Sequence, residues 1–199
     1  GGFLLDTVRG RAADLVKRLS MYKLRADVAI RDASEDLVVA AVWGGDEGAV
    51  PAGAADGAHV FADPRLAALG ARVLAEAKGA DEVLANIGER VPAEAYHAHR
   101  IGLGVPEGGR DFVLGDTFPH EALMDQLGGV SFTKGCFVGQ EVVSRMQHRT
   151  TVRKRVVPVV AEAELPTGPL PVLAAEAEIG RVGCVAGTRG LALLRLDRV

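Results

Sequence analysis

The chain carries a cysteine between two glycines, in the segment KGCFVGQE, and these residue types at this spacing predict thiol chemistry. Glycine adopts positive φ at little cost, so Gly135 and Gly139 allow a tight loop that presents Cys136 outward. A helix predicted to begin near Gln140 would place free backbone amides beside this loop, where they favour an anion. Together with the charge of Lys134, this environment favours the thiolate over the thiol. The segment therefore predicts a reactive cysteine.

The cysteines and histidines of the chain predict no metal site. The local sequence also permits a buried Cys136 that packs as a small hydrophobic side chain, and this alternative stays open. Cys184 lies in a strand pattern, RVGCV, and we expect it to be structural. Two cysteines without zinc-ligand spacing indicate no structural zinc, and they cannot supply the four thiolates that usually hold an iron–sulfur cluster. We interpret four histidines as solvated or core residues: His97, His99, His120 and His148.

The composition is typical of a soluble globular protein, and the two cysteines, with no CxxC motif and no zinc-ligand spacing, fit a reducing cytoplasm best. At 199 residues, with 48% hydrophobic and 25% charged residues, the chain can form one generous domain or two small ones. The net charge of −3 leads us to expect no direct nucleic-acid binding. The longest apolar run, Leu37 to Trp43, is far shorter than the roughly 20 residues of a membrane span, so we expect no membrane contact. The opening residues, GGFLLD, resemble the inside of a protein, and we expect a further segment upstream.

Residues 1–150 are predicted to form a mixed α+β region that positions the cysteine. Apolar residues at helical spacing from Val8 to Leu19 predict one amphipathic helix, and Pro92 fits the first turn of another. Residues 44–57, rich in glycine and alanine, predict a loop, and residues 69–77 are compatible with either a strand or a helix. Four strands are predicted: Phe3–Leu5, Val28–Ile30, Leu37–Trp43 and His59–Ala62. The second and third of them are expected to form a hairpin.

After Thr150 the pattern changes to short β-branched runs separated by turns that contain proline. Residues 151–199 are therefore predicted to form a small all-β domain. Its predicted strands are Val152–Val157, Ile179–Val185 and Leu191–Leu196.

The segment KGCFVGQE resembles the K-G-C-[YF]-x-G-Q-E signature of the YgfZ-type branch of the glycine-cleavage T-protein superfamily, which is related to mitochondrial iron–sulfur assembly factors. Further landmarks in family order extend the similarity over essentially the whole chain: MYKLRADV, FPHE and GGVSF before the signature, and IGRVG and LALLR after it. The resemblance implies a T-protein-like folate-binding α+β region over residues 1–150, incomplete at its N-terminus, and a C-terminal β-barrel over residues 151–199. It also implies a bacterial cytoplasmic protein with tetrahydrofolate, or a folate derivative, as its cofactor.

The resemblance makes Cys136 the functional thiol, with Lys134 beside it as a second catalytic candidate and Gly135 and Gly139 as motif glycines. Phe137 stands where the family commonly has tyrosine. A pterin ring needs a carboxylate or amide at its amino-pyrimidine edge, and the glutamate tail of a folate needs cations. The residues expected to contact the cofactor are Arg100, Glu121, Gln140, Glu141 and Arg145, with Arg149 as an alternative to Arg145. Arg100 could instead be a surface residue at a helix end, and Glu121 an ordinary first-turn acid.

These assignments predict a folate-binding accessory factor for iron–sulfur cluster assembly or repair. We expect it to be a monomer, and to act with iron–sulfur assembly proteins or client enzymes, including enzymes that modify tRNA. The alternative is a folate-dependent, aminomethyltransferase-like one-carbon transferase, which would need a positioned carboxylate rather than a thiol. A purely structural interaction module is the third possibility. The signature cysteine favours the accessory factor.

Overall fold

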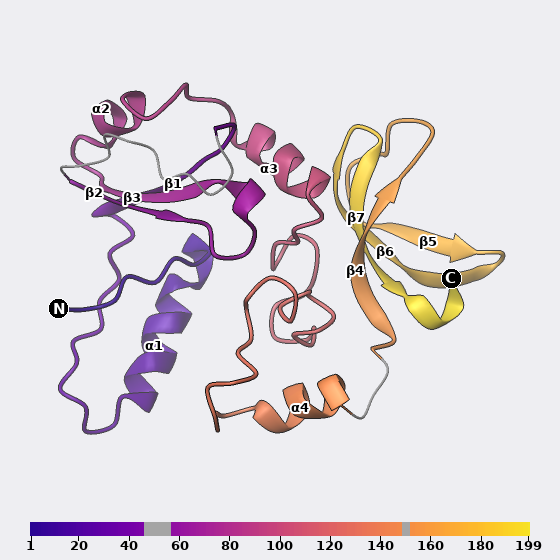
Figure 1. Cartoon of the computed structure of the whole chain (residues 1–199), viewed down its shortest axis with the longest axis horizontal. Helices are drawn as coiled ribbons and strands as arrows, with labels where there is room; N and C mark the ends of the chain where they lie inside the picture. The colour runs from indigo at the N-terminus through magenta and orange to yellow at the C-terminus, as the bar shows by residue number, and fades with distance from the viewer. Residues whose placement is uncertain (46–56, 149–151) are drawn as a thin grey trace. The chain divides into compact units, whose positions relative to one another are not determined.

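The computed structural model describes residues 1–45, 57–148 and 152–199, which form two compact units (Figure 1). The N-terminal unit comprises residues 1–63 and 70–90, and the C-terminal unit comprises residues 64–69 and 91–199. The predicted domain boundary between residues 150 and 151 lies outside the described residues and stays a prediction.

The N-terminal unit is built on a three-stranded antiparallel sheet in the order β1-β3-β2. The central strand carries the apolar run Val73-Leu74-Ala75, whose side chains suit a position paired on both edges. Val73 and Ala75 of this strand form a small core with Ala80 of the helix that follows. The elements of this unit are η1 (Arg9–Arg11), α1 (Ala12–Tyr22), β1 (Leu37–Val42), β2 (Ala58–Ala62), β3 (Ala71–Glu76) and α2 (Ala80–Ala85).

Two of the strands predicted in this unit are confirmed as β1 and β2, and the ambiguous run at residues 69–77 forms β3. The predicted strands Phe3–Leu5 and Val28–Ile30 are wrong, and so is the hairpin, because β1 pairs with β3 instead. Runs of three residues provide few ladder hydrogen bonds, so a distant partner decides whether they become strands. The predicted loop at residues 44–57 lies almost entirely outside the described residues.

The C-terminal unit packs a helix against a four-stranded antiparallel sheet in the order β4-β7-β6-β5. Ile101 of the helix α3 packs in one core cluster with Val156 of β4, Leu191 of β7 and Leu123. This cluster fixes α3 on the sheet by burial of apolar surface. The elements of this unit are η2 (Ala67–Leu69), α3 (Ala93–Gly102), α4 (Gln140–His148), β4 (Lys154–Val160), β5 (Leu170–Ala174), β6 (Ala177–Ala186), β7 (Arg189–Arg195) and η3 (Leu196–Arg198).

The mixed α and β content is confirmed, and the C-terminal region is all-β apart from its final 3-10 turn, but its sheet is open rather than closed. Within the described residues no pairing joins β4 to β5, the two strands at the ends of the sheet. The sequence also gave no prediction of β5, because prolines around it indicate turns. Pro171 lies on an edge strand, where proline is tolerated because the strand is paired on one side only.

In the described part of the chain, no helix combines the length and the apolar content that a bilayer crossing requires.

Candidate functional site

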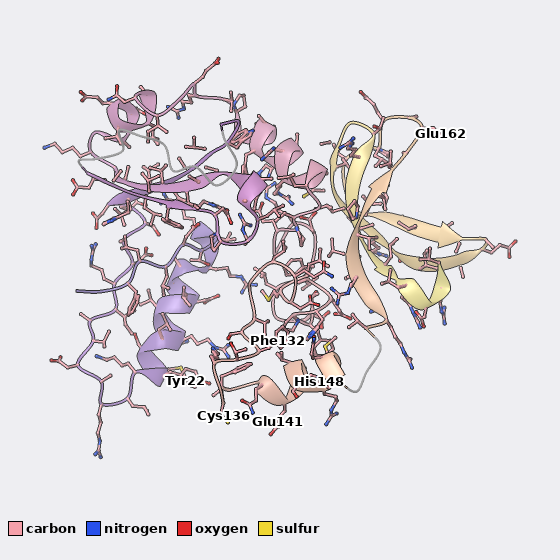
Figure 2. The ribbon with its side chains drawn as sticks, viewed as in Figure 1. Tyr22, Phe132, Cys136, Glu141, His148 and Glu162 are labelled. Carbon is pink, nitrogen blue, oxygen red and sulfur yellow. The ribbon has the colours of Figure 1, made fainter. Side chains whose placement is uncertain are left out.

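The signature segment forms an exposed loop immediately ahead of α4 (Figure 2). Gly135 and Gly139 have φ angles of +86° and +89°, so the predicted use of glycine at these positions is confirmed. α4 begins at Gln140, where the sequence placed the start of a helix. Cys136 is a free and exposed thiol, which removes the alternative of a buried packing cysteine.

The side chain of Gln140 turns back over the loop and contacts it at two atoms. The backbone N–H of Phe137 donates to Gln140 Oε1 at 2.8 Å. Gln140 Nε2 donates to the Sγ of Cys136 at 3.8 Å. The amide therefore uses both its acceptor and its donor within the signature segment. The predicted folate contact of Gln140 is untested, and its observed contacts are with the loop.

Lys134 lies on the other side of the cysteine in sequence and makes a different set of contacts. Its Nζ lies 4.6 Å from the centroid of the Phe137 ring, within the range of a cation–π interaction. Its backbone N–H donates to the Oγ of Ser131 at 3.2 Å. The aromatic ring of Phe137 thus holds the lysine charge close to the loop, and this contact needs no hydroxyl group.

α4 is attached to the rest of the C-terminal unit by a buried histidine. His120 is 1% exposed, and its Nε2 lies 3.1 Å from Oε1 of Gln147 in the last turn of α4. Val143, in the middle of the helix, is also buried. The ring of His120 lies 6.2 Å from that of Phe132, which leads into the signature loop. The interpretation of His120 as a core histidine is confirmed, and its role as the anchor of α4 is a feature that sequence reasoning missed.

Arg100, predicted to contact folate or to lie on the surface, is fully buried near the end of α3. Its Nη1 donates to Oδ2 of Asp111 at 2.6 Å and to the carbonyl oxygen of Val105 at 3.1 Å. Burial alone would lower the pKa of Arg100, but the charge and hydrogen bond of Asp111 raise it above its usual value. The surface alternative is therefore wrong. The folate contact stays a prediction, and it would have to compete with these internal partners.

Asp111 connects this buried pair to strand β6. Its Oδ1 accepts the backbone N–H of Cys184 at 2.8 Å, and Nη2 of Arg100 donates to the sulfur of Cys184 at 3.1 Å. Burial raises the pKa of the Cys184 thiol, and the negative charge of Asp111 raises it further. A protonated, partly buried thiol is a poor nucleophile, so the geometry agrees with a structural role for Cys184.

The other residues predicted to contact the cofactor lie in different parts of the unit: Glu121 in a segment of turns, and Glu141 and Arg145 on α4. Glu121 accepts the backbone N–H of Phe118 on its Oε2 at 3.0 Å, within a segment of turns rather than the first turn of a helix. Glu141 and Arg145 are exposed on α4, and this carboxylate and guanidinium fit the polar groups that a folate presents. Arg149 lies outside the described residues. No group of three metal-ligating side chains is found in the described ranges.

Comparisons with known proteins relate the chain to one domain family and to a set of similar proteins. The C-terminal β-barrel domain of CAF17 matches residues 153–199. The human mitochondrial iron–sulfur cluster assembly factor IBA57 is 36% identical over 209 residues, which cover 100% of this chain and 58% of that protein. The chain is a homologue of the IBA57 assembly factors. The mouse IBA57 protein is 35% identical, with 99% of this chain and 57% of the relative covered. A Neurospora crassa IBA57 homologue is 34% identical, with 79% of this chain and 38% of the relative covered.

The predicted resemblance is confirmed, because the YgfZ-type branch and the IBA57 proteins are related. The chain spans about half the length of the curated relatives it matches. The predicted bacterial cytoplasmic location is wrong, because the similar IBA57 proteins of human, mouse and Neurospora crassa are named as mitochondrial. The prediction treated unpaired cysteines as a sign of the cytoplasm, although reduced thiols alone do not distinguish one reducing compartment from another.

Proposed function

We propose that this chain is part of an accessory factor for the assembly or repair of iron–sulfur clusters, and that Cys136 is its functional thiol. The observation that carries the proposal is the exposed Cys136 on the signature loop of a chain homologous to IBA57 proteins. An exposed thiol beside a helix start and a lysine is accessible to a protein partner or to a cluster in transfer. The partners we propose are iron–sulfur assembly proteins and client enzymes, with tRNA-modifying enzymes among the clients.

Tetrahydrofolate, or a folate derivative, is the cofactor we propose. The exposed carboxylate of Glu141 and guanidinium of Arg145 support this, because both lie on α4 and suit the polar groups of a folate. Arg100 gives less support, since its guanidinium is buried against Asp111. We propose that a T-protein-like arrangement completes the pocket in the whole protein, and that the protein acts as a monomer without direct contact to nucleic acid.

The experiment uses the full-length parent protein, its Cys136→Ala variant and its Arg145→Ala variant. Tetrahydrofolate binding is measured by calorimetry, and the activity of an iron–sulfur enzyme is measured in cells that carry each protein in place of the native one. The proposal expects Cys136→Ala to bind folate as the parent does while the client enzyme loses activity. It expects Arg145→Ala to bind folate more weakly.

Different results would separate the parts of this proposal. Client activity that is unchanged by Cys136→Ala would reject the thiol as the functional group. Calorimetry without heat for the parent protein would reject folate, whatever the client activity. Turnover of a one-carbon donor by the parent protein would replace the accessory role with a folate-dependent transferase.

A further inference from the structure

The two contacts of the Gln140 side chain fix which end of its amide faces the cysteine. The Phe137 partner is a backbone N–H, which can only donate, so the atom 2.8 Å from it must be the amide oxygen. The NH₂ group is then necessarily the end that points to Cys136 Sγ, at 3.8 Å. The oxygen and nitrogen ends of a glutamine amide are often hard to tell apart, but here the backbone N–H of Phe137 determines which end is the oxygen.

We propose that Gln140 is a positioning residue for the Cys136 thiol, which it holds in place through the loop and whose sulfur it stabilises as a thiolate through its NH₂ group. A donated N–H stabilises a charged sulfur more than a neutral one, because charge-assisted hydrogen bonds are the stronger ones. This inference deepens the proposed function, since it rests on Cys136 as the functional thiol. It also gives Gln140 a role at the cysteine in place of the predicted contact with folate.

The position of Gln140 is itself fixed by the C-terminal unit. Gln140 is the first residue of α4, and this helix is held by buried Val143 and by the contact of His120 with Gln147. A group that tunes a reactive atom needs such a support, because an error of about 1 Å removes most of its effect. The Cys136 loop, by contrast, is exposed, and the Gln140 side chain links it to α4 beside two backbone hydrogen bonds, from Gln140 N–H to Phe137 and from Val143 N–H to Gly139.

The Gln140→Glu substitution separates the two contacts. A glutamate keeps an oxygen acceptor for the Phe137 N–H, but it replaces the NH₂ donor with a negative charge beside the sulfur. It does not disturb the helix, because acidic residues are favoured in a first turn. Gln140→Met removes both contacts with a side chain of similar size.

The assay is the rate at which iodoacetamide alkylates Cys136, followed by mass spectrometry between pH 6 and pH 10. We expect Gln140→Glu to raise the midpoint of the pH–rate profile by about one pH unit, the shift that one negative charge a few ångströms away produces. The rate at neutral pH should then fall severalfold. Ser144→Glu is the matched control, because it adds the same charge one turn farther along α4 and should move the midpoint much less.

A profile for Gln140→Glu equal to that of the parent, with a changed profile for Gln140→Met, would show that Gln140 only caps the loop and would overturn the proposal. Equal shifts in Gln140→Glu and Ser144→Glu would also overturn it, because general charge would then explain the effect. Cys136→Ala defines the labelling background. The readout needs neither folate nor a client enzyme, so failure of the proposed function leaves this test intact, and the reverse also holds.

Discussion

The buried carboxylate of Asp111 is the group whose removal should most damage the C-terminal unit. Its side chain is 0% exposed, as is that of Arg100, and their closest atoms are 2.6 Å apart. Asp111 also accepts the backbone N–H groups of Glu107 and Cys184, each at 2.8 Å. We therefore expect Asp111→Asn to leave a buried guanidinium without its carboxylate and to turn an NH₂ group toward donors.

The size of this loss follows from the charges that remain. Removal of one partner from a buried ion pair costs about 3–5 kcal/mol of unfolding free energy. Glu107 Oε2 lies 3.2 Å from Arg100 Nε and partly replaces the lost charge, so we expect the lower end, about 3 kcal/mol. For a protein of this size, that corresponds to a melting temperature lower by roughly 6–12 °C.

Thermal and urea unfolding, followed by circular dichroism, measure this loss. The matched control is Glu178→Gln in the same unit, where Glu178 pairs with Arg181 at 3.0 Å but the side chains are 48% and 66% exposed. An exposed pair of this kind contributes about 0–1 kcal/mol. The reasoning would be refuted if Asp111→Asn lost no more stability than this control. Arg100→Met should be destabilised similarly, whereas a folate-only role for Arg100 requires a stable variant that binds folate weakly.

Three further predictions test other parts of the C-terminal unit. Burial would raise the pKa of Asp125, but the two hydrogen bonds and the charge of Arg155 hold it below its ordinary value of 3.8. The stability that this pair adds is therefore present above pH 3.8, and it is lost as the pH falls through the lower pKa of the folded state. Arg155→Met should therefore lower the urea midpoint at pH 7 more than at pH 2.5, and equal losses at both pH values would argue against this pair. His120→Ala should destabilise the unit by about 2 kcal/mol and increase proteolysis within residues 131–139, and an unchanged cleavage rate would show that α4 has another anchor. Gly180→Ala should lower the melting temperature by several degrees, because the added Cβ would overlap the carbonyl oxygen of Leu193 in the adjacent strand, and an unchanged melting curve would contradict this register.

Local sequence patterns predicted the features that depend on local physics. The positive φ angles of Gly135 and Gly139 and the start of α4 at Gln140 were predicted because glycine and helix termini have strong intrinsic preferences. The strands β1 and β2 were also predicted, since their apolar and β-branched runs are six and five residues long, whereas the run that forms β3 was compatible with either a strand or a helix. By contrast, α2 has only six residues and no predicted pattern, and short helices depend on packing rather than on propensity.

Long-range pairing decided what the sequence alone could not. Arg100 is a residue of a type that often binds anionic ligands. Only the packing of residues 107–111 against β6 brings Asp111 to it and buries the two side chains as an ion pair. No local signal marks this difference, because the partner carboxylate could equally have faced solvent. The same reasoning applies to His120, whose contact with Gln147 joins positions 27 residues apart.

The Arg100–Asp111 pair and His120 each hold a different part of the C-terminal unit in place, and each part carries one of the two cysteines. The Arg100–Asp111 pair fixes α3 and β6 and keeps the thiol of Cys184 within a structural hydrogen-bond network. His120 and Val143 fix α4, and through Gln140 the helix reaches the exposed Cys136. One thiol is thereby protected by partial burial and the other is presented on a supported loop, so a reagent or a partner that selects for accessible thiols should react with Cys136 and leave Cys184 unmodified.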